Sequence, residues 1–260
     1  MLSFADTQWN RELFLNAVSM EDDMYGGYYY GFDWTYLLVL IGAVICLVAS
    51  ANVKSTFNRF SGQRSMTGMT GAEAAQRILN HAGIYDVTIQ HISGTLTDNY
   101  NPRQKTLNLS DAVYNATSVA AIGVAAHECG HAIQHREEYA PLNIRSAIVP
   151  AANIGSRLAW PLILIGLFIT SETGVFFINL GIIAFSLAVI FQLVTLPVEF
   201  NASRRALVLL EDCGILSESE LPSTKKVLSA AALTYVASAA SGILQLLRLI
   251  LLTNGRRRRD

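Results

Sequence analysis

The sequence predicts a mainly α-helical membrane protein with three to four transmembrane helices and one small α+β unit. Hydrophobic residues make up 52% of the 260 residues and charged residues only 15%, whereas soluble domains carry about 25% charged residues. Several apolar segments are long enough to span a bilayer. They flank a stretch of ordinary soluble composition within residues 54–145. These observations favour membrane helices attached to a compact unit outside the bilayer.

The first apolar segment determines the predicted orientation. Residues 1–33 contain six acidic residues and one basic residue, and residues 34–53 contain no charge, which suits a transmembrane helix. Three basic residues, Lys54, Arg59 and Arg64, follow closely. Because positive charge favours the cytoplasmic side, we expect an extracytoplasmic segment 1–33, a transmembrane helix 34–53 and a cytoplasmic unit 54–145.

The cytoplasmic unit is expected to begin with a short helix and two or three strands. Residues 73–81 (EAAQRILNH) predict a helix that ends at Gly83, and three short runs predict strands at 87–92, 95–100 and 105–109. We hypothesise that the last run, KTLNL, is an edge strand able to bind an extended peptide by strand addition. An internal hairpin strand fits this run equally well.

The segment SVAAIGVAAHECGHAIQHREE, residues 118–138, contains the motif H-E-x-x-H. Residues i and i+4 lie on one face of a helix, so His127 and His131 are expected to bind one Zn²⁺ ion. Glu128 lies one step round the helix. It is expected to be the general base that takes a proton from a zinc-activated water. The motif therefore predicts a zincin-like catalytic unit within residues 54–145.

This motif helix is expected to be enclosed by protein at its start. Residues 119–126 are all small or apolar, and Thr117 or Ser118 can cap the helix. Gly123 and Gly130 each cost roughly 1 kcal/mol of helix stability relative to Ala, but they permit close approach of a neighbouring helix or ligand. An enclosed face favours a metal site over the alternative, a solvated helix with two histidines on one face.

A catalytic zinc ion needs a third protein ligand and an open position for water. His135 continues the i, i+4 series, but it lies about 12 Å along the helix from His127, too far for both to bind one ion. The better candidate is Glu199, which follows Pro197 in LPVEFNASRRAL at the start of a predicted helix. The alternative is that this carboxylate only stabilises the helix start.

Two further apolar segments predict a transmembrane helical hairpin at 146–198. Residues 146–170 are mostly apolar but contain Arg157, and residues 174–198 contain no charge. Two antiparallel spans would return Glu199 to the same side of the membrane as His127, as a shared metal site requires.

The C-terminal part, residues 199–260, is expected to contain the third-ligand helix and further helices. Residues 227–247 are apolar and rich in alanine, so they are long enough to span a bilayer. A fourth span would carry the basic residues 256–259 outside, against the usual charge asymmetry. The other interpretation, slightly favoured by the small residues, is a helical pair broken at Gly242 and packed on the catalytic unit and membrane surface.

The sequence also argues against nucleic-acid binding, a disulfide framework and a closed structural zinc site. No basic stripe with interleaved aromatic residues indicates nucleic-acid binding. The three cysteines, at positions 46, 129 and 213, form no evident disulfide framework. Cys129 is two residues after His127 and points off the metal face, so it does not complete a closed structural zinc site.

Several sequence blocks together resemble the bacterial neutral zinc membrane metallopeptidase family. They are TGAEAAQRIL (70–79), LTDNYNPRQKTLNLSDAVYN (96–115), VAAHECGHAIQH (124–135), PLNIRSAIVPAANIGS (141–156) and KKVLSAAALTYVA (225–237). The likeness runs from about Met24 to the C-terminus. It implies a multi-pass protein of the bacterial plasma membrane with zinc peptidase activity.

A more distant likeness, to CAAX-type membrane gluzincin proteases, rests on HECGH and EFNAS. In those proteases the Glu of an E-x-x-x-D block binds zinc, which matches Glu199. This sequence has Ser203 where that pattern has Asp, so a carboxylate that orients a zinc histidine would have to come from elsewhere.

The expected function is therefore zinc-dependent endopeptidase activity at the cytoplasmic membrane face, on a peptide or membrane-protein substrate. Glu128 is the expected base, and Arg204 and Tyr235 are candidates, by residue type only, for stabilising the oxyanion. The competing interpretation is a non-catalytic membrane scaffold or partner-binding protein with a structural or absent metal. Sequence alone leaves the oligomeric state open.

Overall fold

The computed structural model describes residues 33–169 and 171–257, which fall into two compact units. Among these residues, the first unit contains Ala49–Tyr139 and Val198–Thr234. The second contains residues 33–48, Ala140–Pro197 and residues 235–257. The predicted extracytoplasmic segment 1–33 lies, apart from Asp33, outside the described residues.

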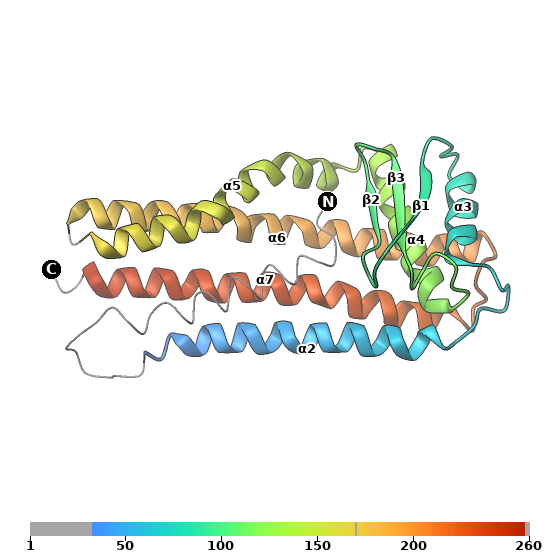
Figure 1. The fold of residues 1–260 in the computed structure, drawn as a ribbon, viewed down its shortest axis with the longest axis horizontal. Helices are drawn as coiled ribbons and strands as arrows, with labels where there is room; N and C mark the ends of the chain where they lie inside the picture. Colours follow the sequence, from blue (N-terminus) through green and yellow to red (C-terminus); the bar gives the residue numbers. More distant parts are fainter. Residues whose placement is uncertain (1–32, 170, 258–260) are drawn as a thin grey trace. The chain divides into compact units, whose positions relative to one another are not determined.

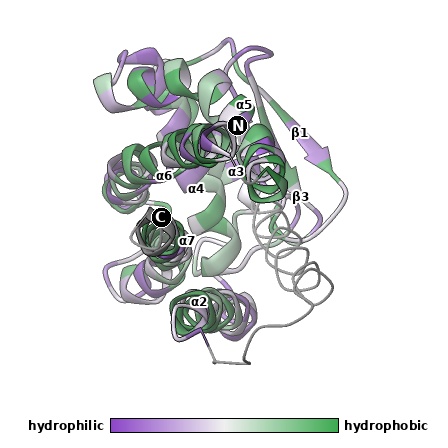
Figure 2. Ribbon diagram, turned by 90° about the vertical axis from the view of Figure 1, so that its left-hand side faces the viewer, coloured by the Kyte–Doolittle hydropathy of each residue, from purple (hydrophilic) through white to green (hydrophobic). Residues whose placement is uncertain are grey.

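Four helices of the described chain are long and apolar enough to cross a membrane. They are α2 (Tyr36–Ser61), α5 (Ala140–Phe168), α6 (Glu172–Asp212) and α7 (Leu221–Arg257). Figure 2 shows their apolar residues in green. A mainly helical membrane fold is thus confirmed. The side of the membrane on which each helix ends stays a prediction.

Two predicted helix boundaries are wrong. Pro197 does not precede a new helix, because α6 continues through it; Glu199 is therefore an interior residue of α6 and cannot be a helix-start charge. Gly242 does not break the C-terminal segment, because α7 is continuous. Instead, a Cβ atom at Gly242 would lie 2.6 Å from Oε1 of Gln192 on α6. This glycine permits close packing within the second unit.

The predicted helical hairpin forms from α5 and α6. Glycines on each helix lie against backbone of the other: a Cβ atom at Gly155 would lie 2.5 Å from the carbonyl oxygen of Ala184, and one at Gly181 would lie 2.8 Å from that of Ala159. Small residues let apolar helices approach closely where a membrane offers no hydrophobic driving force between them.

The first unit contains a three-stranded sheet beside two short helices (Figure 1). The helices are α3 (Gly71–His81) and α4 (Val119–Arg136), and the strands are β1 (Thr88–Ile92), β2 (Asn99–Asn101) and β3 (Thr106–Ser110). The predicted helix 73–81 is confirmed. It begins two residues earlier than predicted, at Gly71, directly after the first residue of a capping box. In that box the Thr70 hydroxyl accepts from the Glu73 amide, and the Glu73 carboxylate accepts from the Thr70 amide.

The hypothesis that the run 105–109 is an edge strand is wrong. The strand order is β1-β3-β2, in which β3 pairs parallel with β1 and antiparallel with β2. Leu107 and Leu109 are fully buried, as expected for a strand at the centre of the sheet. The edge strand that contacts the motif helix is β2.

The motif helix α4 runs through the interior of the first unit. All its residues from Val119 to Gln134 are buried, and the hydroxyl of Ser118 caps it by accepting from the Ala121 amide. The surrounding core includes fully or nearly fully buried side chains from α3, β3, α6 and α7, among them Ile78, Leu107, Leu210 and Val227. Burial on every side confirms that the motif is enclosed by protein.

Candidate metal centre

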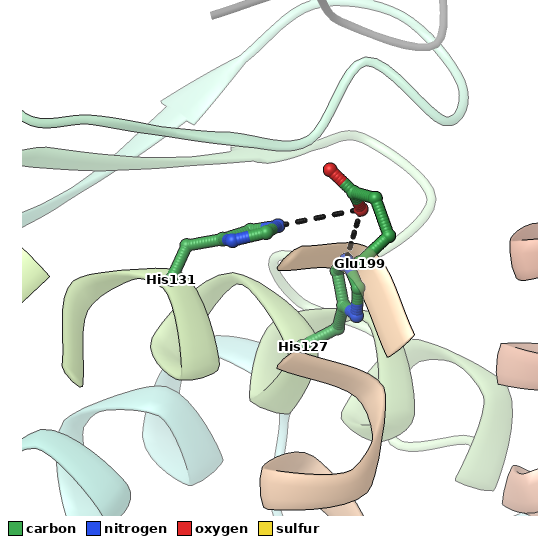
Figure 3. Close-up of side chains that lie close together, drawn as sticks. All are labelled: His127, His131 and Glu199. Atoms are coloured by element: carbon green, nitrogen blue, oxygen red, sulfur yellow. Dashed lines mark hydrogen bonds and ion pairs between the residues drawn. The ribbon is translucent and has the colours of Figure 1, made fainter. Parts of the chain in front are cut away.

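Three side chains from two helices converge inside the first unit (Figure 3). His127 and His131 extend from α4 toward Glu199 of α6, and one ligand atom from each residue lies within 4.8 Å of the others. All three residues are buried. The pair of imidazoles and a carboxylate 68 residues after His131 in the sequence thus form one compact group.

The two spacings between Glu199 and the imidazoles are compatible with a shared metal ion. Oε2 of Glu199 lies 3.3 Å from Nε2 of His127 and 3.5 Å from Nε2 of His131, beyond the common range of about 2.7–3.2 Å for N–H···O bonds. Ligand atoms held tetrahedrally at about 2.0–2.1 Å from zinc lie roughly 3.3–3.4 Å apart. Two nitrogens and one oxygen are also a ligand set that zinc takes in catalytic sites.

Both imidazoles are oriented by uncharged side chains at their other nitrogen. Nδ1 of His127 lies 3.1 Å from the hydroxyl of Ser203, and Nδ1 of His131 lies 3.0 Å from Oε1 of Gln134. These contacts turn both Nε2 atoms toward Glu199. The orienting carboxylate expected from the distant gluzincin likeness is replaced at His127 by the Ser203 hydroxyl itself.

Glu128 is placed to exchange a proton beside this group. Its carboxyl group accepts a hydrogen bond from the backbone N–H of Tyr100 in β2, whereas Oε2 is buried and has no hydrogen-bond partner among the described residues. Burial raises the pKa of Glu128 to about 7. A group with a pKa near the working pH can both accept and donate a proton efficiently.

The two ligand-bearing helices lie in direct contact because a glycine faces the contact. A Cβ atom at Gly130 would lie 2.8 Å from the carbonyl oxygen of Ala202 on α6. The expectation that Gly130 permits close approach is thereby confirmed. Gly123 has the same role against α7, since its Cβ would lie 2.5 Å from a side-chain atom of Thr224.

Other residues considered from the sequence lie outside the converging group. Cys129 points to α3, where its Sγ lies 3.6 Å from the Ala75 carbonyl oxygen. Nδ1 of His135 hydrogen-bonds with the Tyr100 hydroxyl. Arg204 is exposed on α6, and Tyr235 lies on α7 in the second unit. The roles of Arg204 and Tyr235 as oxyanion stabilisers stay predictions.

Sequence reasoning missed three contacts of the site, those made by Ser203, Gln134 and Tyr100. Ser203 follows Glu199 by four residues and Gln134 follows His131 by three, so each lies near the ligand on its own helix. That spacing could have suggested both residues. Nothing local to the sequence indicates that the Tyr100 amide reaches Glu128.

Comparison with known proteins agrees with this geometry. The family described as "Putative neutral zinc metallopeptidase" matches residues 35–254. The chain belongs to this family. It is also 47% identical over 209 residues to the "Putative membrane protease YugP" of Bacillus subtilis, an alignment that covers 80% of this chain and 92% of that relative. No solved structure matches the chain.

Family membership confirms the resemblance drawn from the sequence blocks. It assigns the chain to the zinc metallopeptidases, and the four long apolar helices agree with the membrane location in the name of the Bacillus relative. The group formed by His127, His131 and Glu199 supplies a place where the zinc implied by the family name could bind.

Proposed function

We propose that the protein is a zinc-dependent membrane endopeptidase that cleaves peptide bonds near the cytoplasmic membrane face. The observation that carries this proposal is the convergence of two imidazoles and one carboxylate beside a buried carboxyl group with one unpartnered oxygen. His127, His131 and Glu199 would hold the ion. Zinc, when bound, polarises the scissile carbonyl and lowers the pKa of water.

Glu128 is the proposed general base. The Tyr100 amide holds its carboxyl group by one hydrogen bond. Oε2 is left to take a proton from the attacking water and to deliver it to the leaving amine. Side chains that exclude bulk water surround both groups, because the ligands and Glu128 are each less than a tenth exposed.

An extended peptide is the substrate that the sheet favours. The edge strand β2 contacts α4 through the Tyr100 amide and the Tyr100 hydroxyl, so a peptide paired along it would pass close to Glu128. Edge strands bind extended peptides through backbone hydrogen bonds. The strand-addition hypothesis thus applies to β2 in place of the run 105–109.

The proposed location is the bacterial plasma membrane, with the catalytic unit in the cytoplasm. The first candidate span is followed closely by Lys54, Arg59 and Arg64, and such clusters favour the cytoplasmic side. Its substrate would be a peptide or membrane protein accessible from that face, and the bilayer is its other partner.

Zinc content and proteolysis of the purified protein in nanodiscs test this function. Wild type should bind about one zinc ion and cleave labelled casein. Glu128→Gln should retain the metal and lose at least about 100-fold in kcat, because general bases typically contribute that much. Glu199→Ala should lose the metal. Glu218→Gln, on the exposed connection between α6 and α7, is the matched control and should resemble wild type.

The alternative, a non-catalytic scaffold, predicts that wild type does not cleave casein, or that wild type and Glu128→Gln show the same cleavage. Full zinc occupancy in Glu199→Ala would reject the third ligand even if the protein proved to be a peptidase.

A further inference from the structure

Gln134 is a fully buried amide that contacts both helices of the candidate metal centre. It lies on α4, one turn after His131, and its exposed fraction is 0%. Its Oε1 lies 3.0 Å from Nδ1 of His131. Its Nε2 donates to the carbonyl oxygen of Val198 at 2.9 Å and to Oδ1 of Asn201, also at 2.9 Å, both on α6. All three polar contacts of this amide thus involve residues at or next to the ligands.

The hydrogen-bond network fixes which way this amide faces. The Val198 carbonyl can only accept, so the NH₂ group of Gln134 must face it. Oδ1 of Asn201 accepts from Nε of Arg205 at 2.8 Å, and a guanidinium can only donate. Both neighbours therefore leave Oε1 of Gln134 to face His131. Because that oxygen only accepts, Nδ1 of His131 must carry the proton.

In the neutral imidazole, this proton placement leaves the other nitrogen of His131 with a lone pair. Nε2 of His131 lies 3.5 Å from the carboxylate oxygen of Glu199. A lone pair that faces a carboxylate in a buried site is unfavourable unless a proton or a metal ion lies between them. The amide thus sets the tautomer that a metal ligand needs.

The same amide also holds α6 beside α4 at the position of Glu199. Val198 immediately precedes Glu199, and Asn201 follows it by two residues. At the solvent-exposed end of the network, Nη2 of Arg205 lies 2.6 Å from the carboxylate of Glu137, the residue that follows the end of α4. Gln134 therefore donates two hydrogen bonds, one to the Val198 backbone and one to the Asn201 side chain, that hold the turn of α6 carrying the third ligand.

We propose that Gln134 is a positioning residue that selects the metal-binding tautomer of His131 and sets the distance between the two ligand-bearing helices. This inference rests on the proposed function. An amide suits the position because it accepts and donates without adding charge. A carboxylate there would be a third buried acid beside Glu128 and Glu199, which raises the cost of burial.

Substitution at Gln134 with zinc affinity as the measurement tests this role. Gln134→Met fills a similar volume without polar atoms. Gln134→Asn keeps the amide but is one methylene too short to reach both helices. Both should weaken zinc binding by about 10- to 100-fold, as removal of groups that orient metal ligands typically does. The matched control is Gln76→Met, because Gln76 is exposed on α3 and its side chain hydrogen-bonds to Asn80, away from the ligands.

Affinities would be measured by chelator competition, and the visible spectrum of the Co²⁺-substituted protein would report ligand geometry. A purely structural Gln134 would lower the melting temperature of the metal-free protein while leaving zinc affinity and the Co²⁺ spectrum unchanged. That result, or zinc affinity within about threefold of wild type in either variant that folds, would overturn the proposal. Should wild type itself bind no zinc, the proposed function fails first, so the two failures are distinguishable.

Discussion

Gly130 allows α4 and α6 to approach at the level of the metal ligands, so adding one methyl group there should separate the two helices. A Cβ at this position would lie 2.8 Å from the Ala202 carbonyl oxygen, whereas ordinary contacts begin at 3.4 Å. The difference requires a movement of about 0.6 Å, more than the roughly 0.5 Å that a functional constellation tolerates. Gly130→Ala should therefore move the third ligand away from the imidazole pair.

The effect on stability should be small because two contributions oppose each other. Overpacking a core typically costs about 1–3 kcal/mol, and replacing a helical glycine by Ala returns about 1 kcal/mol. The net loss of about 0–2 kcal/mol is too small to unfold the protein. Zinc affinity, by contrast, should fall about tenfold, because groups that fix ligand geometry typically contribute at least that much.

Thermal unfolding of the metal-free protein and zinc affinity by chelator competition separate these effects. The control is Gly62→Ala, where a Cβ would lie 3.9 Å from its nearest neighbour, the Arg59 carbonyl oxygen; it should leave both measurements unchanged. If Gly130→Ala bound zinc as tightly as wild type, the contact between α4 and α6 could accommodate the added methyl group without moving the ligands. The claim that this approach sets the ligand spacing would then be refuted.

Two further substitutions test groups that hold the site. Ser203→Ala removes the hydroxyl that contacts Nδ1 of His127, so zinc affinity should fall about tenfold; chelator competition with an unchanged affinity would show that the hydroxyl does not orient the ring. Tyr100→Phe removes the hydroxyl that bonds to His135, so β2 should be held less firmly beside Glu128. Peptide cleavage should then show kcat reduced about threefold to tenfold, from the loss of roughly 1 kcal/mol in one hydrogen bond, with zinc content unchanged. A parallel loss of zinc would contradict that assignment.

The sequence by itself determined the features that depend on short spacing along the chain. Four residues separate His127 from His131, and helical geometry then places both rings on one face whatever surrounds them. Thr70 and Glu73 likewise set the start of α3 through contacts within one turn. Apolar length predicted the membrane helices for the same local reason, since a span must be long enough to cross the hydrocarbon core.

Proline and glycine were less informative, because their effect depends on what packs around them. Pro197 lacks an amide hydrogen, which commonly ends or kinks a helix, yet α6 continues through it and carries Glu199 in its interior. From composition alone, Gly242 is expected to break a helix. It lies instead within α7, where a neighbouring side chain leaves no space for a Cβ atom.

The tertiary structure alone decided which groups meet across long separations. The parallel pairing of β3 with β1 makes the run 105–109 the central strand, and no spacing within that run encodes its neighbours. The docking of α6 on α4 likewise brings Ser203 to His127 and Gln134 to Val198. Periodicity places a side chain on a face of its own helix, whereas the partner of that face is set by packing of the whole unit. The ligands could therefore be proposed from the sequence, whereas the side chain that each orienting group contacts across the two helices was decided by the tertiary structure.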